Sequence, residues 1–285
     1  MNMNLKDGLD TMTDSIDKKP KCMYHTQVTA TNELGEVLFE KSNVILVGGR
    51  RFTLEKLFNV TSTTRLTLNQ ILGINADYNK SASTTDGPLK ETAVCLFGVG
   101  TGGSGATLGS VANPSAKESN LYNIVPMRYV EDEKELMVPG SKYYMHKEID
   151  GMHAFYLKRF EQQPVIKLMV NGMPAVLNNA DNSQPTYGNS AETYDLTADI
   201  ETYIELQLTI GKEDVREYFQ HITDNGADSS EHARINELAL YLGYHDGDEA
   251  WSDYKEVEAF SKLTFNNESL ADDTKVINII YRIYI

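Results

Sequence analysis

Residues 98–103 form a glycine pattern that binds phosphates in some proteins. The segment GVGTGG fits G-x-G-x-x-G, in which backbone amides at the start of a helix hold the pyrophosphate of a dinucleotide. That chemistry needs a helix that begins at the glycines, but further glycines and Pro114 occupy the stretch where it should lie. The segment also lacks a Walker lysine. We therefore expect no cofactor, and we expect residues 98–119 to form an irregular loop, flexible or wrapped around a partner.

Metal-binding residue types are present, but without a diagnostic spacing. The six histidines have no H-E-x-x-H arrangement and no nearby cysteine pair: they are His25, His146, His153, His221, His232 and His245. His245 opens an acidic stretch that extends to Asp253, whose carboxylates could hold calcium, yet the EF-hand order of ligands is absent. We interpret residues 245–253 as a solvated acidic turn between two strands and expect no metal ligand.

Catalytic groups also lack a recognisable motif. The sequence contains no G-x-S-x-G nucleophile elbow, and no hydroxyl or thiol stands in a motif with a base. Neighbouring carboxylates such as Asp272 and Asp273 are common in an acidic chain and do not indicate glycoside hydrolysis. Cys95 lies in the apolar run AVCLF, where a buried thiol acts as a small hydrophobe. We expect no catalytic residues and a protein that is not an enzyme.

A group of aromatic residues has two interpretations. Tyrosine and tryptophan are enriched at interfaces, so the group could stack on a sugar or contact a protein. Aromatic residues also favour strands, where they pack on the faces of a sheet, and we favour this second interpretation. The residues concerned are Tyr143, Tyr144, Tyr241, Tyr244, Trp251 and Tyr254.

The net charge of the chain limits the classes of partner that we expect it to bind. Asp and Glu number 41 against 26 Lys and Arg, which gives a net charge of -15. Proteins that bind nucleic acid or anionic membranes cluster cations, and this sequence has only short basic groups such as the pair Arg50 and Arg51. No apolar run approaches the length of about 18 residues that spans a membrane. We therefore expect neither a nucleic acid nor a membrane as partner.

The elements that would position these groups are mostly strands. Residues 24–30 and 36–40 flank an Asn/Gly turn and predict a hairpin. A run at 44–47 precedes an amphipathic helix at 50–58, and residues 61–91 are interpreted as connecting loops. Further strands are predicted at 92–97, 124–130, 141–147, 152–160, 164–170, 202–210, 235–244 and 257–265, with a helical turn in 212–220 and a loop at 178–189. The fold class is mainly β and antiparallel, sandwich-like, with a few short helices and long loops.

The clearest strand patterns lie in the second half of the chain. In residues 202–210, apolar and polar side chains alternate, which is typical of a half-buried antiparallel strand. The chain ends in a segment with one apolar face, formed by Ile277, Ile279, Tyr281, Ile283 and Ile285. Such a face must be buried in a sheet, and we expect it beside residues 202–210 or 257–265 of the same chain.

The domain organisation follows from the composition. The first 20 residues are polar, contain few aromatics and end at Pro20, which predicts a flexible or partner-docked arm. They lack the apolar region of a secretory signal, so the protein is expected to be made in a cytoplasm. Residues 21–285 form a β-rich structural domain, with two subdomains possible at about 21–175 and 196–285.

Several short phrases resemble structural proteins of large tailed bacteriophages. They are NELGEVLF (32–39), NVILVGGR (43–50), FGVGTGG (97–103), VPMR (125–128), RINELALYL (234–242), FSKLTF (260–265) and IYRIY (280–284). The resemblance implies a virion component made in the bacterial host, which binds other virion proteins and copies of itself. It implies a place in the tail, baseplate or neck. A capsid-surface decoration protein and a carbohydrate- or receptor-binding module are the alternatives.

Overall fold

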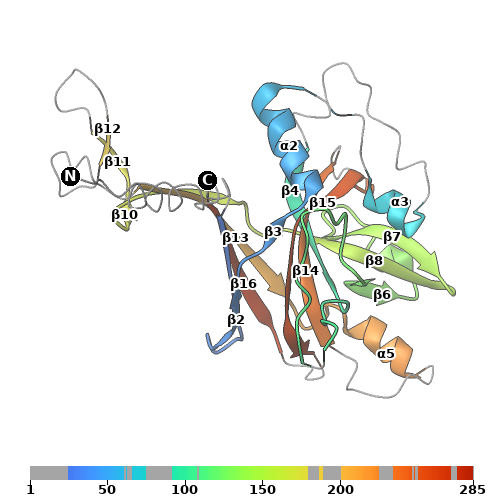
Figure 1. Cartoon of the computed structure of the whole chain (residues 1–285). Helices are drawn as coiled ribbons and strands as arrows, with labels where there is room; N and C mark the ends of the chain where they lie inside the picture. Colours follow the sequence, from blue (N-terminus) through green and yellow to red (C-terminus); the bar gives the residue numbers. More distant parts are fainter. Residues whose placement is uncertain are drawn as a thin grey trace, which may run out of the picture. The chain divides into compact units, whose positions relative to one another are not determined.

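The described part of the chain is built mainly from two large antiparallel sheets and three short helices. The computed structural model describes residues 25–60, 62, 66–74, 92–107, 109–178, 186–188, 200–224, 234–245, 247, 250–270 and 275–284. Within these residues one sheet has six strands and the other eight (Figure 1). The prediction of a mainly β, sandwich-like fold is confirmed. The predicted arm, residues 1–20, lies outside the described residues, as does most of the predicted loop at 178–189.

Two compact units divide the chain. The larger contains residues 27–165 and 205–282, and the smaller is built around residues 166–204. The eight-stranded sheet belongs to the larger unit. Its order is β3 (Val44–Ile45), β15 (Lys255–Ser269), β14 (Arg234–Tyr244), β4 (Ala93–Gly100), β8 (Met152–Arg159) and β6 (Arg128–Val130), with β5 (Ile124–Val125) on β4 and β7 (Tyr143–Ile149) on β8.

The six-stranded sheet contains the terminal strand. Its order is β10 (Met173–Pro174), β9 (Val165–Val170), β13 (Ile200–Ile210), β16 (Ile277–Tyr284), β1 (His25–Thr31) and β2 (Val37–Lys41). A separate pair joins β11 (Val176–Asn178) to β12 (Thr186–Gly188). β13 alternates as predicted, with Leu206 and Leu208 buried and Gln207 exposed. The hairpin of β1 and β2 is also confirmed, and the Asn32 side chain accepts hydrogen bonds from the amides of Leu34 and Glu36 in its turn.

The last strand is docked within its own chain. Ile277, Ile279 and Tyr281 are almost fully buried, and β16 lies between β13 and β1. The predicted pairing beside residues 202–210 is therefore confirmed, whereas β15, the other expected neighbour, belongs to the opposite sheet. The hydroxyl of Tyr281 makes a 2.7 Å hydrogen bond to Ser261 of β15, so the terminal strand packs across the interior. Ile285 lies outside the described residues.

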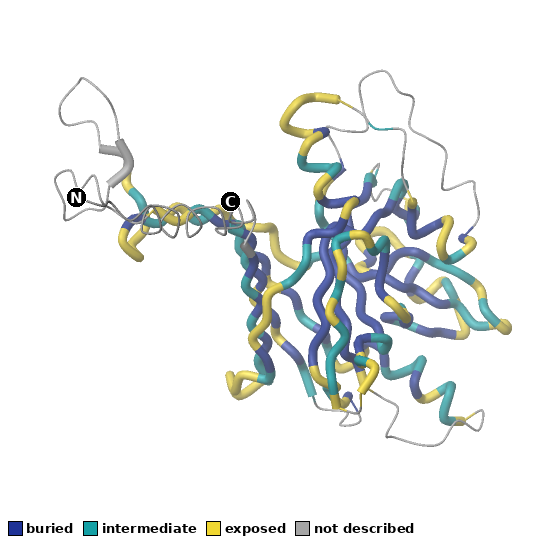
Figure 2. The backbone as a smooth tube through the Cα atoms, in the orientation of Figure 1, coloured by how far each residue is buried: buried dark blue, intermediate teal, exposed yellow. Residues whose placement is uncertain are grey.

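The two sheets of the larger unit pack face to face. The rings of Phe39 on β2 and Phe265 on β15 stack with centroids 4.3 Å apart. The buried Lys158 of β8 donates a 3.0 Å hydrogen bond to the carbonyl of Thr209 on β13 and pairs with the buried Asp214 at 2.8 Å. Figure 2 shows that the backbone of this unit is mostly buried along its central strands. Both apolar stacking and a satisfied charge pair therefore fill the space between the sheets.

The three helices differ in part from the prediction. α2 (Val47–Phe58) begins earlier than expected, and its glycines lie inside the first turn instead of ending a strand. The reason is close packing on β15, since a Cβ on Gly49 would come within 2.9 Å of the Phe260 ring. α3 (Leu68–Leu72) stands in a region interpreted as loop, where Thr67 and Gln70 form a capping box. α5 (Arg216–Asp224) matches the expected helical turn. No helix among the described residues is long and apolar enough to cross a membrane.

Candidate functional site

The glycine segment is not the loop that its composition predicted. β4 continues to Gly100, so the first half of the pattern is strand, and Gly100 lies directly opposite Glu237 of β14. The rest of the segment packs against β14, where the amide of Gly103 donates to the Asn236 side chain at 2.6 Å. The expectation of an irregular loop from residue 98 onward is therefore wrong for residues 98–100. Glycine is required at these positions because a Cβ on Gly98 would lie 2.7 Å from the Leu157 side chain and a Cβ on Gly100 would lie 2.5 Å from the carbonyl of Asn123.

One amide of this segment, that of Gly102, does bind an anion, which is a carboxylate of the same chain. Glu237 is fully buried and accepts hydrogen bonds from the amides of Gly102 at 2.6 Å, Tyr122 at 2.7 Å and Asn123 at 3.1 Å. A Cβ on Gly102 would lie 2.7 Å from this carboxylate, so glycine is required for the approach. A pyrophosphate would need the same amides and would meet a buried negative charge. The motif therefore serves an internal contact.

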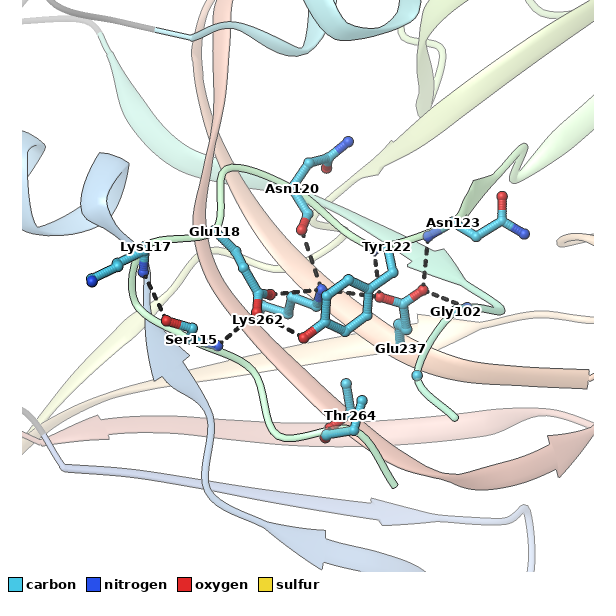
Figure 3. A network of polar contacts seen from close by, with 12 residues as sticks. Gly102, Ser115, Lys117, Glu118, Asn120, Tyr122, Asn123, Glu237, Lys262 and Thr264 are labelled. Carbon is cyan, nitrogen blue, oxygen red and sulfur yellow. Dashed lines mark hydrogen bonds and ion pairs between the residues drawn. The ribbon is translucent and has the colours of Figure 1, made fainter. Parts of the chain in front are cut away.

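A buried lysine balances this carboxylate. Lys262 of β15 is fully buried, and its ammonium lies 3.2 Å from Glu237 and 3.0 Å from Glu118 (Figure 3). It also donates to the carbonyl of Asn120 at 3.3 Å and lies over the ring of Tyr122. Each charge in the cluster has an opposite charge and hydrogen bonds, which is the condition under which burial is tolerated. The network is a structural clamp between β14, β15 and the segment at 115–123.

The acidic stretch after β14 is only partly described, and one of its carboxylates has a structural role. Asp253 is buried and accepts hydrogen bonds from the amides of Met145 at 2.5 Å, His146 at 2.9 Å and Tyr254 at 3.2 Å. Burial raises the pKa of its carboxyl to about 6, against the opposing effect of these hydrogen bonds. The interpretation as a solvated turn is therefore wrong for Asp253. The carboxylates at 246, 248 and 249 lie outside the described residues.

The aromatic group packs in the interior, as favoured above. Tyr144, Tyr241 and Tyr254 are buried, and the rings of Tyr144 and Tyr254 meet edge to face with centroids 4.8 Å apart. Trp251 stacks on Tyr144 at 6.1 Å. Cys95 also behaves as an apolar residue. Burial raises the pKa of its thiol to about 11 and keeps it protonated. Tyr244 and Trp251 are only half-buried.

The hairpin of β7 and β8 brings two of the six histidines together. Asp150 and Gly151 form its two-residue turn, with φ of 53° and 80°, the combination required by a type I′ turn. This turn sets the register, in which His146 lies opposite Phe155 and His153 lies opposite Glu148. Positions that differ by two along paired strands share a face of the sheet. His146 and His153 are therefore diagonal neighbours on one face.

A carboxylate from the next turn completes the cluster. β6 pairs with β8, and a short 3-10 turn (Glu133–Glu135) follows it, capped by the Asp132 side chain. Glu133 Oε2 lies 3.6 Å from His153 Nδ1 and 3.9 Å from His146 Nε2, and the two ring nitrogens lie 3.0 Å apart. Burial and the neighbouring His153 lower the pKa of the His146 imidazole. Two imidazoles and a carboxylate in this arrangement form a group that can hold a metal ion.

Part of this cluster was accessible to sequence reasoning. The Asp-Gly pair between two β-rich runs is the strongest short-range hairpin signal, and it places the two histidines side by side once the register is counted. The expectation of no metal ligand rested on spacing along the sequence, whereas these two histidines meet across a hairpin turn. Glu133 carries no comparable signal, because its approach depends on the pairing of β6 with β8.

An exposed apolar surface lies in the smaller unit. Ile166 is 67% exposed, Met173 is 55% exposed and Ile200 is 66% exposed, and Leu168 and Val176 are also exposed. These residues belong to β9, β10, β11 and the start of β13, and Figure 2 shows a largely exposed backbone there.

Comparisons with protein-family models, with curated proteins and with solved structures found no match to this chain.

Proposed function

We propose that this chain is a non-enzymatic structural subunit of a tailed-bacteriophage virion. It acts through protein–protein contacts in the tail, baseplate or neck region, after synthesis in the host cytoplasm. The resemblance of its phrases at 32–50, 97–103 and 234–284 to phage structural proteins supports the class. The exposed apolar strands of the smaller unit support the mode of action, and they are the observation that carries the proposal.

These strands expose several apolar side chains that are close together in the sequence. On β9, Val165, Ile166 and Leu168 are all exposed, so apolar side chains emerge on both faces of one strand. Contiguous exposed apolar residues mark surfaces that another protein covers, and β9 offers its side chains for such a contact because its backbone is already paired with β10 and β13. A copy of this chain fits best, because an identical strand offers the same apolar side chains in return.

A second exposed apolar group lies on the larger unit. Leu57 and Phe58 at the end of α2 are 66% and 68% exposed, and Leu54 and Val60 are each 55% exposed. A subunit inside a particle has neighbours on more than one side, and each unit of this chain has its own apolar surface. This distribution supports a subunit within an assembly over a monomeric binding module.

Self-association provides the first test. We expect the full chain to form multimers in sedimentation velocity, with an association constant that falls when Ile166 and Ile200 are both changed to Asp. Leu34→Asp is the matched control, because Leu34 is 84% exposed in the β1–β2 turn and should associate like the wild type. A wild-type chain that stays monomeric at every concentration would contradict the proposed contact between copies.

Purified particles provide the test of the class. Mass spectrometry of gradient-purified virions of the phage that encodes the chain should detect it in amounts comparable with other structural subunits. Detection only in the infected-cell lysate, with none in the particles, would rule out a virion protein. Particles depleted of this chain should hydrolyse peptidoglycan or glycan substrates at the same rate as intact particles. This is the result expected for a subunit without catalysis.

A further inference from the structure

We propose that Glu133, His146 and His153 form a binding site for one divalent transition-metal ion, best fitted by zinc. The site lies where β6 and β7 flank β8 in the larger unit, and its two imidazoles are 16% and 18% exposed. Its residues are not those of the apolar strands that carry the proposed function. It uses neither the Glu237–Lys262 network nor the exposed surfaces. Its occupancy can therefore be tested whether or not the chain belongs to a virion.

The distances match a shared metal. Zinc binds imidazole nitrogen at about 2.0–2.1 Å and carboxylate oxygen at about 2.0–2.2 Å in a tetrahedron, which places any two ligand atoms about 3.3 Å apart. The three measured separations are 3.0 Å, 3.6 Å and 3.9 Å. The two distances to Glu133 exceed those of ordinary hydrogen bonds, yet all three ligand atoms lie within 4.8 Å of one another. Small movements of the side chains would bring them to the ligand positions.

Packing and hydrogen bonds hold the His146 imidazole before any ion arrives. Asp253 accepts hydrogen bonds from the amides of Met145 and His146, and Met145 has a φ of 63°. The ring of His146 also packs against Phe155, with centroids 5.0 Å apart, and edge-on against Trp251 at 6.4 Å. A site whose ligands are fixed by packing loses little entropy on binding. This support favours a real site over a chance encounter of polar groups.

The donor set selects the class of ion. Imidazole nitrogens favour zinc, copper, nickel and iron, whereas calcium and magnesium prefer sites made of oxygen ligands. Three protein ligands leave one tetrahedral position for water. Because Glu133 comes from the turn after β6 and the histidines from β7 and β8, a bound ion would link that turn to the hairpin.

The competing explanation is a simple hydrogen bond between the two rings. A separation of 3.0 Å between His146 Nε2 and His153 Nδ1 fits an N–H···N contact, with Glu133 as a distant partner. In that case the cluster would stabilise the hairpin without any ion. The two explanations differ in whether zinc binds, with what stoichiometry, and whether the affinity depends on Glu133.

Titration of the full chain with zinc separates these explanations. After removal of metals with a chelator, calorimetry with zinc chloride should show one ion bound per chain. Glu133→Gln and His153→Gln should each weaken binding at least about 10- to 100-fold, the range seen even for residues that only support ligands. Glu135→Gln is the matched control, since Glu135 is exposed in the same turn and should leave the affinity unchanged.

Cobalt provides an independent readout. The full chain loaded with cobalt should show the visible absorption of a tetrahedral site, and Glu133→Gln should lose it. Near-ultraviolet circular dichroism checks that each variant is folded. If His153→Gln does not fold, Glu133→Gln on the surface turn still distinguishes a metal site from a hydrogen bond between the two rings. Absence of stoichiometric zinc binding would overturn the proposal, as would equal affinity of the wild type, Glu133→Gln and His153→Gln.

Discussion

Lys262 shows how individual residues govern this fold. A fully buried ammonium would be prohibitively unstable alone, but here Glu118, Glu237 and the carbonyl of Asn120 surround it (Figure 3). Glu237 in turn accepts hydrogen bonds from the amide of Gly102 in the glycine segment and from the amides of Tyr122 and Asn123. The same physical requirement, an anion facing clustered N–H groups, is thus met inside the molecule. Removal of Lys262 would leave both carboxylates without their shared positive partner.

Glu118 provides a pH-dependent test of this network. Burial raises the pKa of its carboxyl, but the hydrogen bonds from Tyr122 and Lys262 outweigh burial and the net shift is downward. A carboxyl whose pKa is lower in the folded state stabilises the protein above its unfolded pKa, near 4.5, and that contribution is lost as the pH falls through the folded value. We expect Glu118→Gln to reduce the free energy of unfolding by about 1–3 kcal/mol at neutral pH.

Urea denaturation of the wild type and Glu118→Gln across a pH series measures this effect. The difference between them should shrink as the pH is lowered below the usual carboxyl pKa. Glu131→Gln is the control, because Glu131 is exposed and should change stability little at any pH. A difference that stays constant from neutral to acidic pH would show that the Glu118 charge does not contribute.

At the level of elements, β16 is the strand on which the six-stranded sheet depends. It lies between β13 and β1, so its apolar face is needed to keep the β1–β2 hairpin in place. Ile279 is 1% exposed and faces the interior, whereas Ile280 is 38% exposed on the opposite face. Ile279→Ala should reduce the free energy of unfolding by about 2–5 kcal/mol. Ile280→Ala should cost less than about 1 kcal/mol.

The two substitutions remove the same side-chain volume from opposite faces of one strand. Chemical denaturation of each variant measures how much stability each loss costs. Similar losses for both variants would mean that the alternation along β16 does not determine its burial. A loss confined to Ile279→Ala would agree with the terminal strand as an integral part of the sheet. The two isoleucines share sequence context and strand propensity, so only burial separates them.

The strands were largely predictable because their signal is local. Alternation along β13 and β16 and the turn at Asn32 depend on residues a few positions apart, and the structure confirms them. The start of α2 was not predictable, since glycine in a helix is required there only by the approach of Phe260 on β15. The pairing of Glu237 with Gly102 was hidden for the same reason, because their contact depends on the register of β14 with β4. The candidate metal cluster lies between these cases: the Asp150–Gly151 turn indicates its histidines, but no local pattern indicates Glu133.

For the whole molecule, charge and exposed apolar surface act in opposite directions. A net charge of -15 makes copies of the chain repel one another, which opposes self-association. The exposed side chains of β9, β10 and α2 favour association, and their attraction does not depend on charge. The balance between the two terms should therefore respond to ionic strength.

We expect self-association to strengthen as salt is added. Raising the salt from about 0.01 M to about 1 M shortens the screening length from about 30 Å to about 3 Å, which removes most repulsion between copies. Apolar contacts lose nothing under these conditions, so the association constant from sedimentation velocity should rise. The variant with both Ile166→Asp and Ile200→Asp should respond far less, because it lacks the apolar contact that screening reveals. Association through ion pairs would instead weaken with salt, and that outcome would shift the proposed contact from the apolar strands to charged residues.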